Sequence, residues 1–268
     1  MADPHPKGAV VLVGCGRLGS AILEGWLTTA TVAPADLIIL TPSTKPAAEA
    51  ARALGARVNP LTGALSGAGA LVLAVKPASW REALGPLLED LSPGAPIISV
   101  MAGVKAEEIA ALSGRPVARV MPTTAVAQAR GVAALWSADP GAREAGRRLF
   151  DAIADVVDLD REALMDAATA VAGSAPAFVY AFGQALARAG EQRGLSAEAA
   201  QRLARGALRS AGAGAETGAS LEALIARIAS PGGTTRAGLD AMEAGGDLDR
   251  AAEAAVRAAV ERARAISG

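Results

Sequence analysis

The side chains that most often carry acid–base catalysis are scarce in this chain of 268 residues. It has one histidine, one tyrosine and four lysines, which are His5, Tyr180, Lys7, Lys45, Lys76 and Lys105. A carbonyl that accepts hydride develops alkoxide charge and needs a positioned acid, commonly His, Lys or a Tyr–Lys pair; one turn after Tyr180 stands Gln184 instead. Serine-hydrolase triads lack their base and zinc sites lack ligands. The composition favours a substrate such as a protonated imine, which already carries its proton and positive charge.

Residues 230–235, Ser-Pro-Gly-Gly-Thr-Thr, form a candidate anion site. Ser230 is a preferred helix N-cap and Pro231 suits the first helical position. The two glycines leave N–H groups uncovered by side chains, which makes a nest for a group of carboxylate size, and two hydroxyls follow. The alternative is an elaborate cap without a ligand, which would not need both glycines and both threonines. We therefore predict that this corner binds an anionic group.

The glycine pattern Gly14-x-Gly16-x-x-Gly19 follows an apolar run at residues 10–13 and precedes an apolar-periodic segment. A buried strand, a glycine turn and a helix form the unit that binds a dinucleotide pyrophosphate. Gly14 permits the tight turn, Gly16 lets the backbone approach the phosphates, and Gly19 lets the helix lie close to the strand. The only cysteine, Cys15, lies in this turn, where a tolerated small residue is a better explanation than a redox role.

The residues after the second apolar run indicate which dinucleotide binds. An NAD site usually has Asp or Glu about 20 residues beyond the glycines, on the ribose 2′-hydroxyl. Here the sequence reads LIILTPSTK, with Ser43 and Lys45 but no carboxylate. Hydroxyls and one ammonium can hold a 2′-phosphate, so NADPH is favoured and NADH is the alternative. An ordinary Thr-Pro-Ser turn would explain the same residues without a cofactor.

Lys76 and Pro77 follow another apolar run. The proline directs the chain away from the sheet, which would hold the lysine at the cofactor mouth. A surface lysine that ends a strand is the alternative.

Short apolar runs alternate with helical patterns from residue 8 to about 160, which is typical of an α/β fold with a parallel sheet and helices on both faces. We expect strands at residues 10–13, 37–40, 56–58, 70–75, 96–100, 117–121, 131–136 and 155–159. We expect helices between them at residues 17–29, 46–54, 79–90, 105–112 and 141–152. Ligands bind beyond the carboxyl ends of the strands in such sheets, which is where the glycine turn, Ser43 and Lys76 fall.

After about residue 161 the strand patterns stop and alanine-rich helical patterns take over. We expect helices at residues 162–190, 197–217, 220–229, 232–244 and 247–266. Small residues such as Ala167, Ala170 and Gly173 permit close helix approach, which favours packing against a second copy of the chain. A self-contained helical bundle is the alternative.

Charge and hydropathy exclude several classes of partner. The 26 basic and 27 acidic residues give a net charge of −1, so no strong electrostatic footprint for nucleic acid or an anionic membrane is present. The apolar runs of the first half are strand-length and far short of a membrane span. The N-terminal MADPHPKG lacks a signal-peptide layout and is expected to be a short disordered lead. With a single cysteine, these features predict a cytoplasmic protein whose partner is a small molecule.

Together these motifs resemble the pyrroline-5-carboxylate reductase family, which catalyses the last step of proline synthesis. The similar segments are VGCGRLGSAI at 13–22, AVKP at 74–77, SVMAGV at 99–104, RVMP at 119–122, GSAPAFVY at 173–180 and, most specific, SPGGTT at 230–235. The resemblance implies an NADP-binding Rossmann domain at residues 1–160. It also implies an all-helical substrate-binding and dimerisation domain at residues 161–268, which interlocks in a homodimer; such dimers often assemble into decamers.

The resemblance also assigns site residues, with no metal. The residues that would line NADPH are Val13, Gly14, Cys15, Gly16, Arg17, Leu18, Ser43, Ala74, Val75, Lys76, Pro77, Met101, Ala102 and Gly103. Ser230, Gly233 and Thr234 would offer backbone and hydroxyl groups to the substrate carboxylate. Thr235 would be the catalytic residue, with a hydrogen bond to the imine nitrogen. Hydride would pass from nicotinamide C4 to the imine carbon of 1-pyrroline-5-carboxylate, which becomes C5 of the product L-proline.

The chain departs from the family pattern at two places. The family usually reads M-P-N-T-P where this chain has Met121 and Pro122 followed by Thr123, Thr124 and Ala125, so an amide and a rigid proline are missing. The usual L-K-D-x-V before SPGGTT is replaced by LIARI at 224–228.

Three alternative functions follow. The first is a paralogous reductase of another cyclic imine. The second is a relative of the β-hydroxyacid dehydrogenases, whose usual catalytic lysine on the domain-linking helix is absent here. The third is a non-catalytic dinucleotide sensor, which would have no need for SPGGTT.

Overall fold

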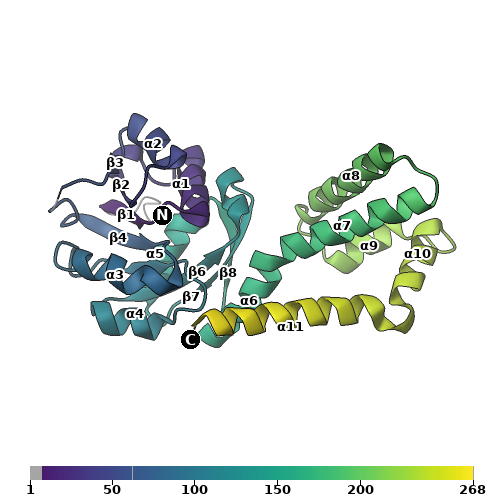
Figure 1. Ribbon diagram of the computed structural model, residues 1–268. Helices are drawn as coiled ribbons and strands as arrows, with labels where there is room; N and C mark the ends of the chain where they lie inside the picture. The colour runs from purple at the N-terminus through teal and green to yellow at the C-terminus, as the bar shows by residue number, and fades with distance from the viewer. Residues whose placement is uncertain (1–7, 62, 268) are drawn as a thin grey trace. The chain divides into compact units, whose positions relative to one another are not determined.

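The computed structural model describes residues 8–61 and 63–267, and the chain divides into two compact units (Figure 1). The first unit comprises the described residues up to Gly173 together with those from Val260 onward. The second comprises Ser174–Ala259. Residues 1–7, most of the expected disordered lead, lie outside the described residues.

The first unit is built on one eight-stranded sheet with the strand order β3-β2-β1-β4-β5-β6-β7-β8. Its strands are β1 (Ala9–Val13), β2 (Leu37–Leu40), β3 (Arg57–Val58), β4 (Ala68–Leu73), β5 (Ile97–Ser99), β6 (Val117–Pro122), β7 (Gly131–Trp136) and β8 (Ala154–Asp158). All eight expected strands are present, within two residues at each end.

One pair of strands departs from the expected parallel arrangement. Every neighbouring pair is parallel except β6 and β7, which run antiparallel with Val120 opposite Leu135. The prediction of a parallel sheet is therefore wrong for this pair. Only residues 123–130 connect the two strands, whereas a parallel crossover needs about a dozen residues or more.

The helices of this unit occupy the intervals between strands. They are α1 (Arg17–Thr29), α2 (Pro46–Ala53), α3 (Trp80–Leu84), α4 (Ala106–Ser113) and α5 (Pro140–Phe150). Short 3-10 turns lie at η1 (Pro34–Asp36), η2 (Pro77–Ser79), η3 (Gly85–Leu87) and η4 (Thr124–Gln128). The helix expected at 79–90 is split into shorter pieces at Gly85 and Pro86, two residue types that interrupt α-helical hydrogen bonding.

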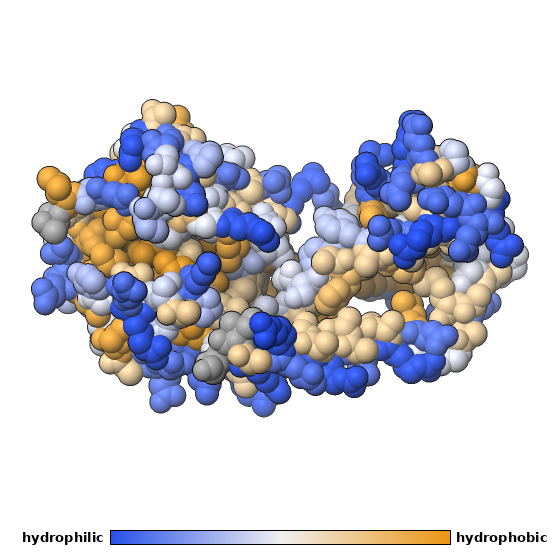
Figure 2. All heavy atoms as spheres, viewed as in Figure 1, coloured by the Kyte–Doolittle hydropathy of each residue, from blue (hydrophilic) through white to orange (hydrophobic). Residues whose placement is uncertain are grey.

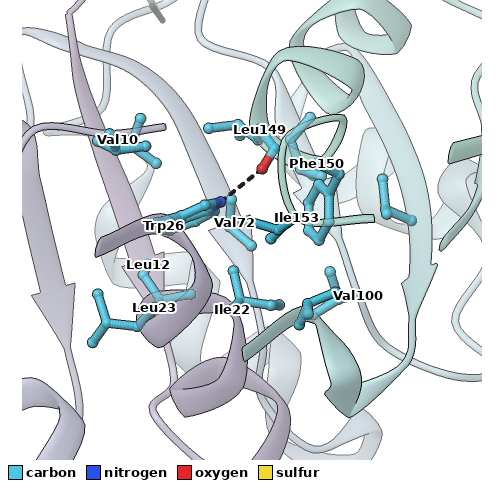
Figure 3. Close-up of a cluster of buried hydrophobic side chains, with 14 of the residues drawn as sticks. Val10, Leu12, Ile22, Leu23, Trp26, Val72, Val100, Leu149, Phe150 and Ile153 are labelled. Atoms are coloured by element: carbon cyan, nitrogen blue, oxygen red, sulfur yellow. Dashed lines mark hydrogen bonds between the residues drawn. The ribbon is translucent and has the colours of Figure 1, made fainter. Parts of the chain in front are cut away.

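Successive side chains of β1 enter two hydrophobic cores on opposite faces of the sheet, as strand geometry requires. Leu12 belongs to the core that includes residues of α1 and α5. Val11 belongs to the core that includes residues of α3 and α4. Figure 3 shows the first core, where Trp26 Nε1 donates a buried hydrogen bond of 2.7 Å to the carbonyl of Leu149. This bond fixes α1, the helix behind the glycine turn, against the end of α5.

The side chain of Arg115 contacts the turn at residues 88–92, which lies between η3 and β5. Its guanidinium donates to the carbonyls of Leu88 (3.1 Å), Leu91 (2.7 Å) and Ser92. Burial lowers the pKa of this guanidinium below its usual value. The side chain therefore holds this turn by three main-chain carbonyls.

The second half of the chain is helical, as expected. Its elements are η5 (Glu162–Leu164), α6 (Met165–Ala168), the π-helical turn η6 (Thr169–Ser174), α7 (Ala175–Gln192), α8 (Ala197–Ala215), α9 (Leu221–Ile228), α10 (Thr234–Glu243), η7 (Ala244–Gly246) and α11 (Asp247–Ser267). The stretch Glu162–Gln192 has the length and composition of a membrane span, with a mean hydropathy of 1.2, and 17% of its most apolar window is buried.

The second unit buries few side chains of its own. Its hydrophobic cluster consists of Ala187, Ala200 and Ala204. Large side chains such as Tyr180 (68% exposed) and Ile228 (71% exposed) lie at the surface. Figure 2 shows apolar residues between hydrophilic patches on the visible face of this unit. Such an apolar surface is typical of a region that contacts another molecule.

Candidate functional site

Main-chain hydrogen bonds join the carboxyl ends of four neighbouring strands where the predicted cofactor residues begin. The pairs are Gly14 N to Leu40 O (2.8 Å), Ala74 N to Val13 O (2.8 Å) and Val100 N to Leu73 O (3.2 Å). They place the segments that follow β2, β1, β4 and β5 side by side at the carboxyl-terminal end of the sheet. β1 pairs with β2 on one side and with β4 on the other, so the strand order reverses at β1. Sheets of this kind bind ligands beyond the carboxyl ends of the strands at this point.

The three glycines of the turn have different surroundings. Gly14 has a φ of 96°, and a Cβ on it would lie 2.5 Å from the carbonyl oxygen of Ala74. A Cβ on Gly19 would lie 2.1 Å from the carbonyl oxygen of Gly14, so α1 lies directly against the turn. Gly16 precedes α1 as its N-cap, no side chain caps this helix, and nothing lies within 4 Å of a Cβ built there. The open space at Gly16 and the uncapped helix fit a dinucleotide pyrophosphate.

The side chains around this turn differ in exposure. Cys15 is buried, with its Sγ 3.4 Å from Ser20 Oγ, while Arg17 is exposed and Leu18 is half-buried. A buried thiol fits the interpretation of Cys15 as a small residue in a tight turn. Among the residues after β4, Ala74, Val75 and Pro77 are half-buried and Lys76 is exposed.

The segment after β2 is held by a residue that sequence reasoning missed. Ser43 is exposed in this segment. The side-chain amide of Asn59 accepts from the N–H of Thr41 and donates to its carbonyl, both at 2.9 Å. The φ of 49° at Asn59 is a left-handed conformation that asparagine tolerates better than most residues. The dipeptide Asn59-Pro60 is a turn signal, but it does not indicate which residue the amide contacts.

The loop after β5 is held by a second contact that sequence reasoning missed. In this loop Met101 and Gly103 (φ 79°) are buried and Ala102 is half-buried. Glu162 Oε1 accepts from Ala106 N at 2.7 Å and from Arg119 Nη1 at 3.0 Å. The Arg119 side chain is 5% exposed, and its Nη2 lies 3.5 Å from the carbonyl of Met101. An arginine within an otherwise apolar strand was the available signal for a buried ion pair.

The candidate anion corner precedes α10. Gly232 has a φ of 72°, the N–H of Gly233 donates to the carbonyl of Ser230 at 3.0 Å, and α10 begins at Thr234. The prediction of Ser230 as the N-cap is wrong, because residues 230–233 form a turn and Gly233 occupies the N-cap position. No side chain caps α10, so the N–H groups of its first turn remain available to an anion.

The sequence-predicted residues thus fall into two groups. Those assigned to the cofactor lie in the first compact unit, and residues 230–235 lie in the second. Among the residues that the structure describes, no group of three or more His, Cys, Asp and Glu side chains is placed to hold a metal ion.

Thr123, which stands where the resemblance leads one to expect asparagine, is engaged in strand pairing. Its N–H donates to the carbonyl of Val132 at 3.0 Å, and its Oγ1 accepts from the N–H of Val132 at 3.3 Å. The residue is 8% exposed. Its hydroxyl oxygen therefore belongs to the β6–β7 pairing.

Two family models match the chain. Residues 162–266 match the model described as pyrroline-5-carboxylate reductase dimerisation. Residues 9–103 match the model described as NADP oxidoreductase, coenzyme F420-dependent.

Relatives and solved structures cover almost the whole chain. The pyrroline-5-carboxylate reductase of Thermus thermophilus is 37% identical over 95% of each chain, and that of Pseudomonas aeruginosa is 31% identical over 96% of each. The solved structure of a Coxiella burnetii pyrroline-5-carboxylate reductase is 26% identical, covers 98% of this chain and 99% of its own, and has a TM-score of 0.87. A Plasmodium falciparum pyrroline carboxylate reductase solved with NADP bound shares the fold, with a TM-score of 0.77 at 24% identity over 98% of this chain and 100% of its own.

Proposed function

The chain belongs to the pyrroline-5-carboxylate reductase family, and we propose that it reduces the cyclic imine 1-pyrroline-5-carboxylate to L-proline with NADPH. The observation that carries this proposal is the presence, in one chain, of a glycine turn that is open at Gly16 and a glycine-preceded helix, α10, without a side-chain cap. The first suits a dinucleotide and the second suits a small carboxylate.

The cofactor residues act mainly through their main chain. The N–H groups at the start of α1 and the positive end of its dipole would hold the pyrophosphate above Gly16. The segments at Ala74–Pro77 and Met101–Gly103 would flank the nicotinamide half. Ser43 would contact the 2′-phosphate from the segment after β2.

The substrate residues would hold one end of the imine. The first-turn N–H groups of α10 and the hydroxyls of Ser230 and Thr234 would bind its carboxylate. The Oγ1 of Thr235 would accept a hydrogen bond from the protonated imine nitrogen and so fix the ring orientation.

The reaction then asks little of the protein in proton transfer. When bound, NADPH supplies a hydride from nicotinamide C4. A C–H bond would form at the imine carbon, which becomes C5 of proline, while the π electrons of the C=N bond move to nitrogen and neutralise its positive charge. The amine product takes up a proton from water. This balance agrees with a chain that has no lysine or histidine after Lys105.

The decisive assay mixes the purified protein with NADPH and 1-pyrroline-5-carboxylate and follows nicotinamide absorbance. We expect rapid loss of absorbance that depends on the imine and produces proline. A six-membered cyclic imine and a β-hydroxyacid with NADP+ are run in parallel. Faster turnover of either would favour the corresponding alternative, and cofactor binding without turnover of any substrate would favour the dinucleotide sensor.

Replacing Ser43 with glutamate should lower the preference for NADPH over NADH by roughly tenfold. A carboxylate at this position would repel the 2′-phosphate and could accept a hydrogen bond from a ribose 2′-hydroxyl. Steady-state KM values for both cofactors measure the preference, with Ser43→Gln as the uncharged control of similar size. An unchanged ratio would mean that the phosphate lies elsewhere.

We also propose that the protein is a homodimer, and that dimers associate further into decamers. The sparse burial within the second unit and the dimerisation model over residues 162–266 support this proposal. The apolar stretch Glu162–Gln192 would then contact a second copy of the chain and not lipid. Light scattering should give an even multiple of the 26.6 kDa chain mass, and a monomer at micromolar concentration would contradict the proposal.

Two further assignments belong to the same proposal. The NADP-binding domain would comprise residues 1–160 and the substrate-binding and dimerisation domain residues 161–268, a division supported by the family match that begins at residue 162. The compact units divide later, between Gly173 and Ser174. A cytoplasmic location would suit the single cysteine and the small-molecule substrate.

A further inference from the structure

Asn59 extends the sheet beyond the end of β3 by two different means. Its main-chain N–H donates to the carbonyl of Ile39 at 2.8 Å, which continues the pairing of β2 with β3. Its side-chain amide then forms a donor–acceptor pair with the main chain of Thr41 at 2.9 Å in each direction. The side-chain amide of Asn59 therefore pairs with Thr41 as the main chain of another β3 residue would.

The contact reaches the predicted 2′-phosphate segment through Thr41. Thr41 is 7% exposed, and its Oγ1 donates to the carbonyl of Ser43 at 3.1 Å. Asn59 thus holds both main-chain groups of Thr41, and the side-chain hydroxyl of Thr41 in turn holds the carbonyl of Ser43. Ser43 itself is exposed and is therefore accessible to a ligand.

We propose that Asn59 is a positioning residue for cofactor selectivity. It holds the segment after β2 so that Ser43 meets the 2′-phosphate of NADPH, and it does so without touching the cofactor. This inference rests on the proposed function, because the role of Ser43 is part of that proposal.

Few other residues satisfy the requirements at this position. The left-handed φ of 49° disfavours most side chains with a Cβ, whereas asparagine and glycine adopt it readily. Asparagine also offers one donor and one acceptor in a planar amide. Aspartate would lose the donor and place a negatively charged acceptor against the carbonyl of Thr41. Asn59→Gly therefore removes the amide and keeps the backbone conformation.

The test is the cofactor preference of Asn59→Gly, since a merely structural role would not move this ratio. We expect KM for NADPH to rise about five- to tenfold, in line with the loss of one or two hydrogen bonds. KM for NADH, kcat at saturating NADPH and KM for the imine should change by less than about twofold. Leu54→Ala, which truncates an exposed side chain at the end of α2, is the matched control and should leave the ratio unchanged.

A double-mutant cycle tests whether Asn59 acts through Ser43. If it does, Asn59→Gly combined with Ser43→Ala should raise KM for NADPH no further than Ser43→Ala alone. Additive effects would show that Asn59 influences the cofactor by another route and would overturn the proposal. A proportional rise in KM for both cofactors, or a lower unfolding temperature with an unchanged ratio, would overturn it as well.

The outcomes separate this inference from the function on which it rests. If Ser43→Glu changes the cofactor preference and Asn59→Gly does not, the inference fails and the function stands. Nicotinamide fluorescence gives the dissociation constants of NADPH and NADH without turnover. The ratio of these constants for wild type and Asn59→Gly therefore decides the inference even if 1-pyrroline-5-carboxylate proves to be the wrong substrate.

Discussion

Replacement of Thr235 with alanine should lower kcat by about 100-fold, the order of magnitude seen when one polar contact to a reacting group is removed. The affinity for NADPH should change by less than about twofold, because the cofactor residues lie in the first unit and Thr235 lies in the second. The residue is exposed in the first turn of α10, so folding should be little affected. Stopped-flow turnover and fluorescence titration of NADPH measure the two quantities separately.

Thr235→Ser is the control for this experiment, because it restores the hydroxyl while removing only a methyl group. It should recover most of the lost rate. Equal losses of kcat in both variants would show that packing of the methyl group matters and not the hydroxyl. A large loss of NADPH affinity in Thr235→Ala would show that Thr235 belongs to the cofactor site and not to the substrate site.

The glycine turn supports a second prediction of large effect. One substitution in it should mainly lower the stability of the fold, and a neighbouring one should mainly weaken NADPH binding. Gly14→Ala should destabilise the folded protein by roughly 2–5 kcal/mol, the sum of a left-handed backbone penalty and a steric overlap. The overlap is with the carbonyl oxygen of Ala74, 2.5 Å from the new Cβ. Gly16→Ala should cost less than about 1 kcal/mol, since its Cβ meets nothing within 4 Å and its φ is −74°.

The expected effect of Gly16→Ala is on the cofactor. Its methyl group would occupy space that the pyrophosphate needs, so the dissociation constant of NADPH should rise by about 10- to 100-fold. Thermal unfolding without cofactor, compared with NADPH titration, distinguishes the two substitutions. Unchanged NADPH affinity in Gly16→Ala would show that the phosphates do not approach the turn at this residue.

Local patterns predicted much of the fold because they arise from neighbouring residues. The apolar run before Gly14 and the periodic apolar residues after it locate β1 and the whole of α1 without knowledge of the rest of the chain. The direction of β7 was missed because it depends on the short connection after β6.

The missed site contacts are of a different kind. Asn59 lies 18 residues from Thr41, and Arg119 lies 43 residues from Glu162. Each contact requires a polar side chain to reach a partner supplied by another element, and no periodicity in the sequence encodes that partner. Serine is a preferred N-cap, but residues 230–233 form a turn, so Gly233 and not Ser230 precedes the first residue of α10.

The main-chain hydrogen bonds that join the ends of β2, β1, β4 and β5 hold the proposed cofactor-binding segments together without a ligand. Preorganised binding segments lose little conformational entropy when the cofactor binds, so more of the interaction energy appears as affinity. Main-chain groups, and not side chains, define the shape of these segments. Exposed residues such as Arg17 and Lys76 can therefore vary in evolution while the cofactor-binding segments keep their arrangement. Selection could in this way retune which nucleotide is preferred without rebuilding the fold.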